Sequence, residues 1–207
     1  MPDRNPLEDR ILDAALERIL LVGIRRASLD DIARHARVNR ITIYRHFATK
    51  ENLVDTVLAR EAERALVSAT EVGIATVGLE TRIEQMMLTL FEVVRSHPII
   101  TRLAAAEPED ALAFYTVRGQ QLVRTAISYV LRFVERGQEL ECLNRYDPAP
   151  VAELIARLTH SLLLTPSGGV DFDDVEQARC FVRRTIVPLL VRGIGTGDMT
   201  HSAPCER

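Results

Sequence analysis

Apolar residues along this chain recur every three or four positions, and short polar segments interrupt the pattern. This period is typical of amphipathic helices, and no stretch shows the strict alternation expected of a β-strand. The sequence therefore predicts an all-α protein. Helices are expected over 7–22, 28–36, 40–47, 50–70, 79–96, 98–106, 109–138, 151–165 and 173–193.

Capping side chains mark several of the expected boundaries. Ser28 with Asp31 three residues later matches a capping box, Asn39 suits the start of the helix over 40–47, and Thr49 can cap the next helix. Interruptions are expected at Gly73 and Gly78, at 144–150 and at 166–169, and the tail 195–207 is expected to be disordered.

The charge distribution is more informative than the net charge of −3, which excludes a general polyanion binder. Residues 25–50 carry seven basic groups against two acidic ones, and they include Lys50, the only lysine of the chain. A local basic patch is expected where phosphates are bound, because those contacts release counterions. A solvated arginine-rich surface would have the same charge, so the patch alone leaves both interpretations open.

The spacing of the cysteines and the length of the apolar segments indicate in which cellular compartment the protein is expected. Cys142, Cys180 and Cys205 are widely spaced and odd in number, which predicts neither a disulfide framework nor a metal site. The first ten residues lack an apolar segment, and the longest run without charge, 158–170, is too short to span a bilayer. We expect a cytoplasmic protein without membrane association, bound metal or cofactor.

Residues 28–53 have the spacing of a helix-turn-helix, in which two short helices are joined by a tight turn. Ile43 and Phe47 should face the core, and Val38 should fill the junction between the helices. Arg40 or Arg45 can donate two hydrogen bonds to a guanine edge. The start of the following helix favours phosphate. The candidate DNA-binding residues are Ser28, Arg40, Ile41, Thr42, Tyr44, Arg45, His46, Thr49 and Lys50.

Residues 10–54 resemble the DNA-binding domain of the TetR/AcrR family of bacterial transcriptional regulators. That family has a hydroxyl residue opening its second helix, an Ile-Ala pair within it, a turn ending in Val-Ser, a recognition helix like KGTLYHHF, and then SKE. The matching positions here are Ser28, Ile32-Ala33, Val38-Asn39, Arg40–Phe47 and Thr49–Glu51. Arg37 replaces the turn glycine, Ile41 replaces a small residue, and Arg45 replaces an aromatic residue or histidine, so the operator sequence is not predicted.

The resemblance implies a homodimer with about nine helices per subunit. It implies a three-helix DNA-binding domain over 1–54 and a ligand-binding and dimerisation domain over 55–194, with the helix over 50–70 linking them. We expect a transcriptional regulator that binds a palindromic operator in double-stranded DNA. A repressor released by a small apolar or amphipathic effector is favoured. An activator of the same fold, and a helical ligand-binding protein or enzyme with a vestigial DNA motif, remain alternatives.

An enzyme is not expected, because no catalytic constellation or phosphate loop is present. An effector pocket is plausible, since one face of the helix over 109–138 mixes aromatic, basic and hydroxyl side chains. Arg118, if buried there, would favour an anionic ligand head. The same residues can equally be core filler. The candidate effector-binding residues are Met86, Met87, Leu90, Phe91, Leu103, Tyr115, Arg118, Leu122, Thr125 and Tyr129.

Two late helices carry apolar stripes that could form a four-helix dimer interface with a second subunit. An intramolecular core would give the same pattern, and the family resemblance favours the interface. The candidate interface residues are Val151, Leu154, Ile155, Leu158, Leu162, Val175, Val182, Ile186 and Leu189.

Overall fold

The computed structural model describes residues 5–99, 101–102, 109, 112, 115–116 and 119–194. Over these residues the chain is helical without any strand, which confirms the predicted all-α class. The helices are α1 (Pro6–Val22), α2 (Leu29–His35), α3 (Arg40–Phe47), α4 (Lys50–Ile74), α5 (Leu79–Ser96), α8 (Gln120–Glu139), α9 (Pro148–Leu164), α10 (Val175–Phe181), the π-helix η1 (Val182–Ile186) and α11 (Val187–Arg192).

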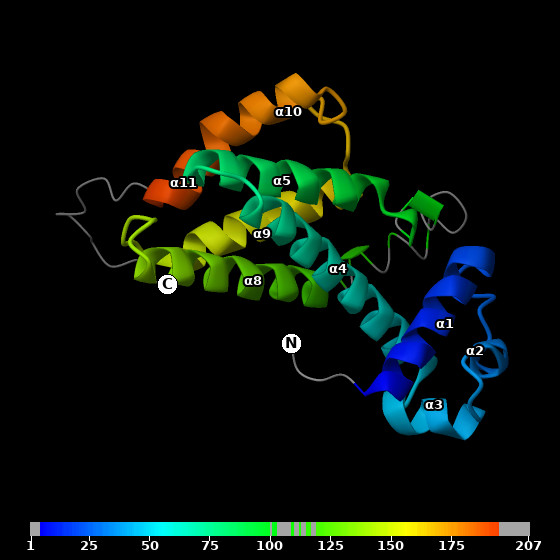
Figure 1. The fold of residues 1–207 in the computed structure, drawn as a ribbon. Helices are drawn as coiled ribbons and strands as arrows, with labels where there is room; N and C mark the ends of the chain where they lie inside the picture. Colours follow the sequence, from blue (N-terminus) through cyan, green and yellow to red (C-terminus); the bar gives the residue numbers. More distant parts are fainter. Residues whose placement is uncertain are drawn as a thin grey trace, which may run out of the picture.

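The helices form two groups that share α4. Helices α1, α2 and α3 pack together at one end, and α4 leaves this group and runs into a bundle with α5, α8 and α9 (Figure 1). Helix α10 lies along the outer side of α5 (Figure 1). One apolar core joins α1–α3 to the first turns of α4, and a second core fills the bundle. The two cores therefore meet along α4.

Side-chain caps define the N-terminal helices where the sequence predicted them. The Ser28 hydroxyl accepts a hydrogen bond from the Asp31 backbone N–H at 3.0 Å and donates one to the Asp31 carboxylate at 2.9 Å. Asn39 accepts from the Ile41 N–H at 2.9 Å, and Thr49 accepts from the Asn52 N–H at 3.1 Å. These bonds satisfy backbone donors that a helix start leaves unpaired, so the beginnings of α2, α3 and α4 are fixed locally.

The turn between α2 and α3 keeps the left-handed geometry that usually calls for glycine. Arg37 has φ of +53°. Its N–H bonds to the Arg34 carbonyl, and the Val38 N–H reaches back to the Ala33 carbonyl at 2.9 Å. This pair of bonds is a Schellman motif. The arginine therefore adopts the conformation of the missing glycine and does not shift the turn.

Arg60 fastens α4 to α1. Its side chain is 2 % exposed and its guanidinium faces three carboxylates. The Nη2 atom lies 2.8 Å from Asp13 of α1, and Nη1 donates to the Asp9 carbonyl at 3.3 Å. Since a buried charge is tolerated only with partners, this cluster fixes where α4 crosses α1.

Two predicted boundaries in the bundle were wrong. Helix α4 continues through Gly73 to Ile74. The glycine does not end the helix but lets α5 pack closely against it, since a Cβ at this position would lie 2.3 Å from Met86 Cγ. Helix α9 begins at Pro148, inside the expected turn. Asp147 accepts a hydrogen bond from the Ala149 N–H at 3.0 Å, and proline suits the first helical position because its missing N–H would be unpaired there.

The predicted last helix is present but contains a π-helical turn. Asp174 caps α10, and η1 follows before α11 begins. Pro188 lacks the N–H that would continue the α-helical pattern, and the Val187 N–H bonds five residues back to Val182. Buried Glu84 of α5 pairs with Arg179 Nε at 3.1 Å and with Arg183, which ties this irregular segment to the bundle.

Candidate nucleic-acid interface and apolar cavity

Helix α3 presents one face to the core and the opposite face to solvent. Ile43 and Phe47 are buried at 1 % and 5 % exposure, as the sequence predicted. Ile41 and Tyr44, by contrast, are 67 % and 42 % exposed, which is high for large apolar side chains. Arg45 lies exposed beside them. An exposed helix of this composition is suited to a DNA groove.

Arg40 is the most constrained side chain of this face. Its Nη1 donates to the Asp30 carboxylate of α2 at 2.9 Å, and its Nη2 donates to the Tyr44 hydroxyl at 3.1 Å. The guanidinium carbon lies 5.4 Å from the centre of the Tyr44 ring. The hydrogen bond that Arg40 donates to Tyr44, and then the charge of Asp30, raise the pKa of Arg40 above its usual value. Arg40 is therefore cationic and oriented.

The remaining candidate DNA-binding residues surround this face. Thr49 is exposed, and Thr42 and His46 are partly buried. Lys50 donates to the Arg25 carbonyl at 3.0 Å, so one of its three N–H groups closes the loop before α2. The Ser28 hydroxyl is engaged with Asp31. The phosphate contacts expected of Ser28 and Lys50 stay predictions, and both side chains also have structural roles.

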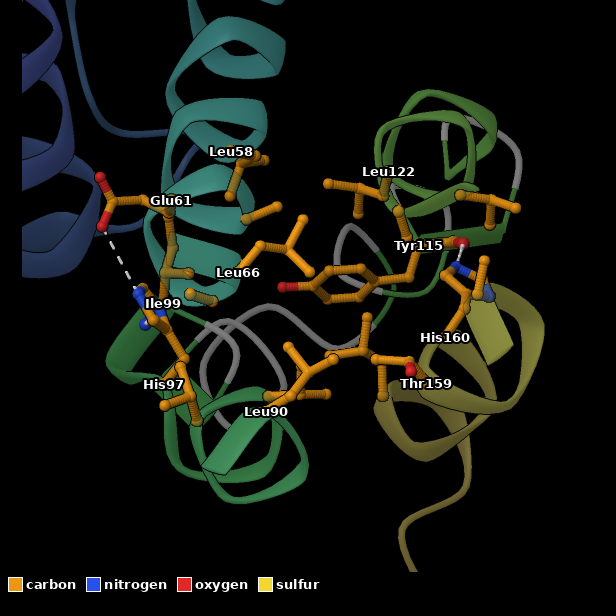
Figure 2. Close-up of a pocket in the computed structure, with 18 residues that line it drawn as sticks. Leu58, Glu61, Leu66, Leu90, His97, Ile99, Tyr115, Leu122, Thr159 and His160 are labelled. Carbon is orange, nitrogen blue, oxygen red and sulfur yellow. Dashed lines mark hydrogen bonds and ion pairs between the residues drawn. The ribbon is translucent and has the colours of Figure 1, made fainter. Parts of the chain in front are cut away.

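The bundle encloses an apolar cavity of about 700 Å³, including the part open to solvent. Its walls come from α4, α5, α8 and α9, and the Tyr115 ring extends across it (Figure 2). Leu66, Leu90 and Leu122 face the same space (Figure 2). A mostly apolar wall with a few polar groups is typical of small-molecule sites.

Polar groups stand at two places on the cavity wall. Glu61 of α4 lies 3.5 Å from His97 Nε2, and His160 Nε2 lies 2.9 Å from the Tyr115 carbonyl oxygen (Figure 2). Burial raises the pKa of Glu61, but the His97 hydrogen bond and the charges of Arg64 and Arg60 outweigh burial and lower it overall. Burial alone raises the pKa of Tyr115. The wall thus combines the Glu61 carboxylate with the hydrogen-bonding side chains of His97 and His160.

The predicted effector residues do not share one site. Leu90, Tyr115 and Leu122 line the cavity. Met86, Met87 and Tyr129, together with Leu90, surround a second, smaller space between α4, α5 and α8. The Tyr129 hydroxyl donates to the Leu66 carbonyl at 2.9 Å.

Other predicted effector residues lie elsewhere. Phe91 packs edge-on against Phe172, with ring centres 5.5 Å apart. Thr125 lies on an outer groove between α4 and α8. Leu103 and Arg118 lie outside the described residues.

Sequence reasoning missed the polar wall of the cavity. The predicted effector-binding residues include none of Glu61, His97, Thr159 and His160. Thr159 is 8 % exposed and faces the cavity from α9 with His160 (Figure 2). The sequence signal for this wall was the pair Thr159 and His160 within an otherwise apolar helix. The residues that face this pair come from distant segments, so the pair alone did not predict a site.

The apolar stripes expected to form a dimer interface are largely part of the subunit's own core. Leu158 and Leu189 are partly buried against that core. Leu154 and Val175 are 51 % and 59 % exposed. Five of the expected residues are buried because α5 and α8 cover α9 and because η1 packs on α5; these are Val151, Ile155, Leu162, Val182 and Ile186.

Among the described residues no group of three or more His, Cys, Asp or Glu side chains could hold a metal ion. Within the same part of the chain no helix is long and apolar enough to cross a membrane.

The exposed α3 on a capped three-helix unit defines a helix-turn-helix regulator that binds DNA. Residues 11–57 match the family model described as bacterial regulatory proteins, tetR family. The chain belongs to the TetR family. It is 22% identical over 153 residues to the uncharacterized HTH-type transcriptional regulator YhgD of Bacillus subtilis, covering 74% of this chain and 80% of that one.

Solved structures share the fold along most of the chain. The TetR family repressor AlkX from Dietzia sp., implicated in biodegradation of n-alkanes, has a TM-score of 0.70 at 19% identity and covers 90% of this chain and 95% of its own. The fatty acid degradation regulator FadR from Bacillus halodurans has a TM-score of 0.54 at 16% identity and covers 97% and 100%. At such identities the likeness shows the fold alone.

Proposed function

We propose that this protein is a homodimeric transcriptional repressor that leaves its operator when a small apolar or amphipathic molecule enters the cavity between α4, α5, α8 and α9. The single observation that carries the proposal is the position of α4. Only two residues separate this helix from the recognition helix, and it lines the cavity with Leu58, Glu61 and Leu66. A ligand that moves α4 therefore moves the DNA-binding unit as well.

Arg60 makes this connection rigid. It is adjacent to cavity-lining Glu61, and its guanidinium contacts Asp9 and Asp13 of α1. A displacement of Glu61 is thus transmitted to α1. In a dimer such motion would change the spacing of the two recognition helices, which must be ~34–36 Å apart to reach adjacent major grooves.

The composition of the cavity favours a ligand with a long apolar part. Its described lining is aliphatic and aromatic apart from Glu61, His97, Thr159 and His160. AlkX is implicated in n-alkane biodegradation and FadR in fatty acid degradation. This chain shares their fold, so alkyl compounds are the first ligands to test.

For the dimer, the exposed apolar Leu154 and Val175 support an interface on the outer faces of α9 and α10. Light scattering at micromolar concentration should give the mass of two chains. A monomer would contradict this part of the proposal.

DNA binding is tested with the duplex upstream of the protein's own gene. Arg45→Ala removes an exposed arginine of the recognition helix, and Arg145→Ala is its matched control, an exposed arginine between α8 and α9. Fluorescence anisotropy should show Arg45→Ala losing about tenfold or more in affinity, and Arg145→Ala binding like the wild type. Equal behaviour of the two variants would refute the assigned interface.

Release is tested by adding a medium-chain n-alkane, a fatty acid or an acyl-CoA to the complex. A fall in anisotropy with one of them supports effector release, and no change with any of them argues against an alkyl effector. A reporter gene behind the operator then separates repressor from activator. Expression should rise when the gene for this protein is deleted.

A further inference from the structure

Arg40 of the recognition helix is held from two helices. Asp30 approaches from the first turn of α2, and Tyr44 lies one turn further along α3. The three side chains form a chain of contacts, with Asp30 accepting from Nη1 at 2.9 Å and Tyr44 accepting from Nη2 at 3.1 Å. All three are at least 42 % exposed, so this cluster stands on the surface.

The contacts leave the guanidinium able to bind further acceptors. Arginine has five N–H donors, and Asp30 and Tyr44 take two of them. A guanine in the major groove offers two acceptors, O6 and N7. The three remaining donors are therefore enough for one guanine edge while both protein contacts persist.

Resting on the proposed DNA-binding function, we propose that Asp30 is a specificity-determining residue that positions Arg40 to read one base pair in each half-site. A free arginine side chain samples many rotamers and reaches phosphates and bases alike. One that is already ordered loses less entropy when it binds a base in a single geometry.

A competing role for Asp30 predicts a different result. If Asp30 only withheld Arg40 from DNA, its removal would strengthen binding to every sequence and steepen the salt dependence. If Asp30 positions Arg40, its removal lowers discrimination at one base pair and leaves the other positions unchanged. Measurements on matched duplexes therefore separate the two roles.

The experiment starts with selection from a pool of duplexes with a randomised centre, using the full-length wild-type protein. Affinities of the wild type and Asp30→Asn are then measured on the enriched duplex and on duplexes with single base pairs changed. We expect the preference at one position per half-site to fall about two- to fivefold in Asp30→Asn, the range of an exposed ion pair. Tyr44→Phe, which keeps the ring and loses the hydroxyl, should lower the base preference at the same position.

Glu17→Gln is the control for the lost charge. Glu17 is an exposed carboxylate of α1 that pairs with His35 and has no contact with Arg40, so its variant should keep the wild-type preferences. Unchanged discrimination in Asp30→Asn, or uniformly tighter binding to all duplexes, would overturn the inference while the DNA-binding function stands. Failure of the wild type to enrich any sequence would instead overturn the proposed function.

Discussion

The DNA-binding unit of α1–α3 and the bundle that holds the cavity are both helical, but different forces define them. Three side chains cap the N-terminal helices, and each accepts a hydrogen bond from a backbone N–H two or three residues ahead: Asn5, Ser28 and Asn39. Helices α5 and α8, which line the cavity, follow Gly78 and Gly119 and start without a side-chain cap, although α9 is capped by Asp147. Local caps therefore define every helix start of the first unit, whereas the starts of α5 and α8 depend on packing between distant segments.

The largest expected effect lies where the two regions join. Arg60→Met should lower the free energy of unfolding by about 3 kcal/mol, because it removes the buried cation that ties α4 to Asp9 and Asp13 of α1 and that also pairs with the mostly buried Glu61. Urea unfolding measures the change. Arg64→Met is the matched control, since Arg64 also contacts Asp13 and Glu61 but is half exposed, and it should cost less than about 1 kcal/mol. Equal costs would show that burial of Arg60 is not what joins the regions.

A change inside the cavity should act on ligand binding. Ala126→Phe places a ring in the cavity from α8. Binding of the neutral fluorescent probe N-phenylnaphthylamine should weaken about tenfold or more. Ser128→Phe puts the same ring on the outer groove of the same helix and should leave probe binding intact. Equal probe binding by both variants would exclude this cavity as the ligand site.

The turn in the DNA-binding unit offers a gain in stability. Arg37→Gly should raise the free energy of unfolding by about 1 kcal/mol, because only glycine adopts φ of +53° without steric cost. Arg37→Ala, which removes the side chain and keeps the Cβ, should bring no such gain. Urea midpoints of the two variants make the comparison. A midpoint for Arg37→Gly at or below that of the wild type would mean that the turn is not strained.

The smallest expected effect is a pH dependence on the bundle side. The pKa of Glu61 in the folded protein lies below its ordinary value of 4.5. Its contribution to stability is therefore present above that value and is lost as the pH falls through the lowered pKa. Unfolding measured from about pH 5 to about pH 3 should show a shallower loss for Glu61→Gln than for the wild type. Glu71→Gln, an exposed change on the same helix, should follow the wild-type curve.

These regions also differ in how well the sequence predicted them. The starts of α2, α3 and α4 were predicted correctly because Ser28, Asn39 and Thr49 act on backbone groups only a few residues away. The burial of Ile43 and Phe47 followed from helical spacing alone. Such short-range signals need no knowledge of the tertiary structure.

The cavity could be predicted only in part. Leu90, Tyr115 and Leu122 were found, but Met86 and Tyr129 belong to the same stripes and face a separate space. Helical periodicity gives a face of a helix, whereas the packing of α4 between α5 and α8 decides which space that face meets. Packing of neighbouring helices likewise decides that Val151 and Ile155 of α9 are buried in the subunit's own core.

The length of α4 sets how large a movement a ligand must cause. Leu66 on the cavity wall and Lys50 at the start of the helix are sixteen residues apart, which gives an arm of about 24 Å. A rotation of roughly 5° about the cavity would carry the start of α4 by about 2 Å, and opposite movements in two subunits would add to about 4 Å. That sum exceeds the rise of one base pair, about 3.4 Å. In the proposed dimer, a rotation of roughly 5° would thus be enough to put two recognition helices out of register with their half-sites.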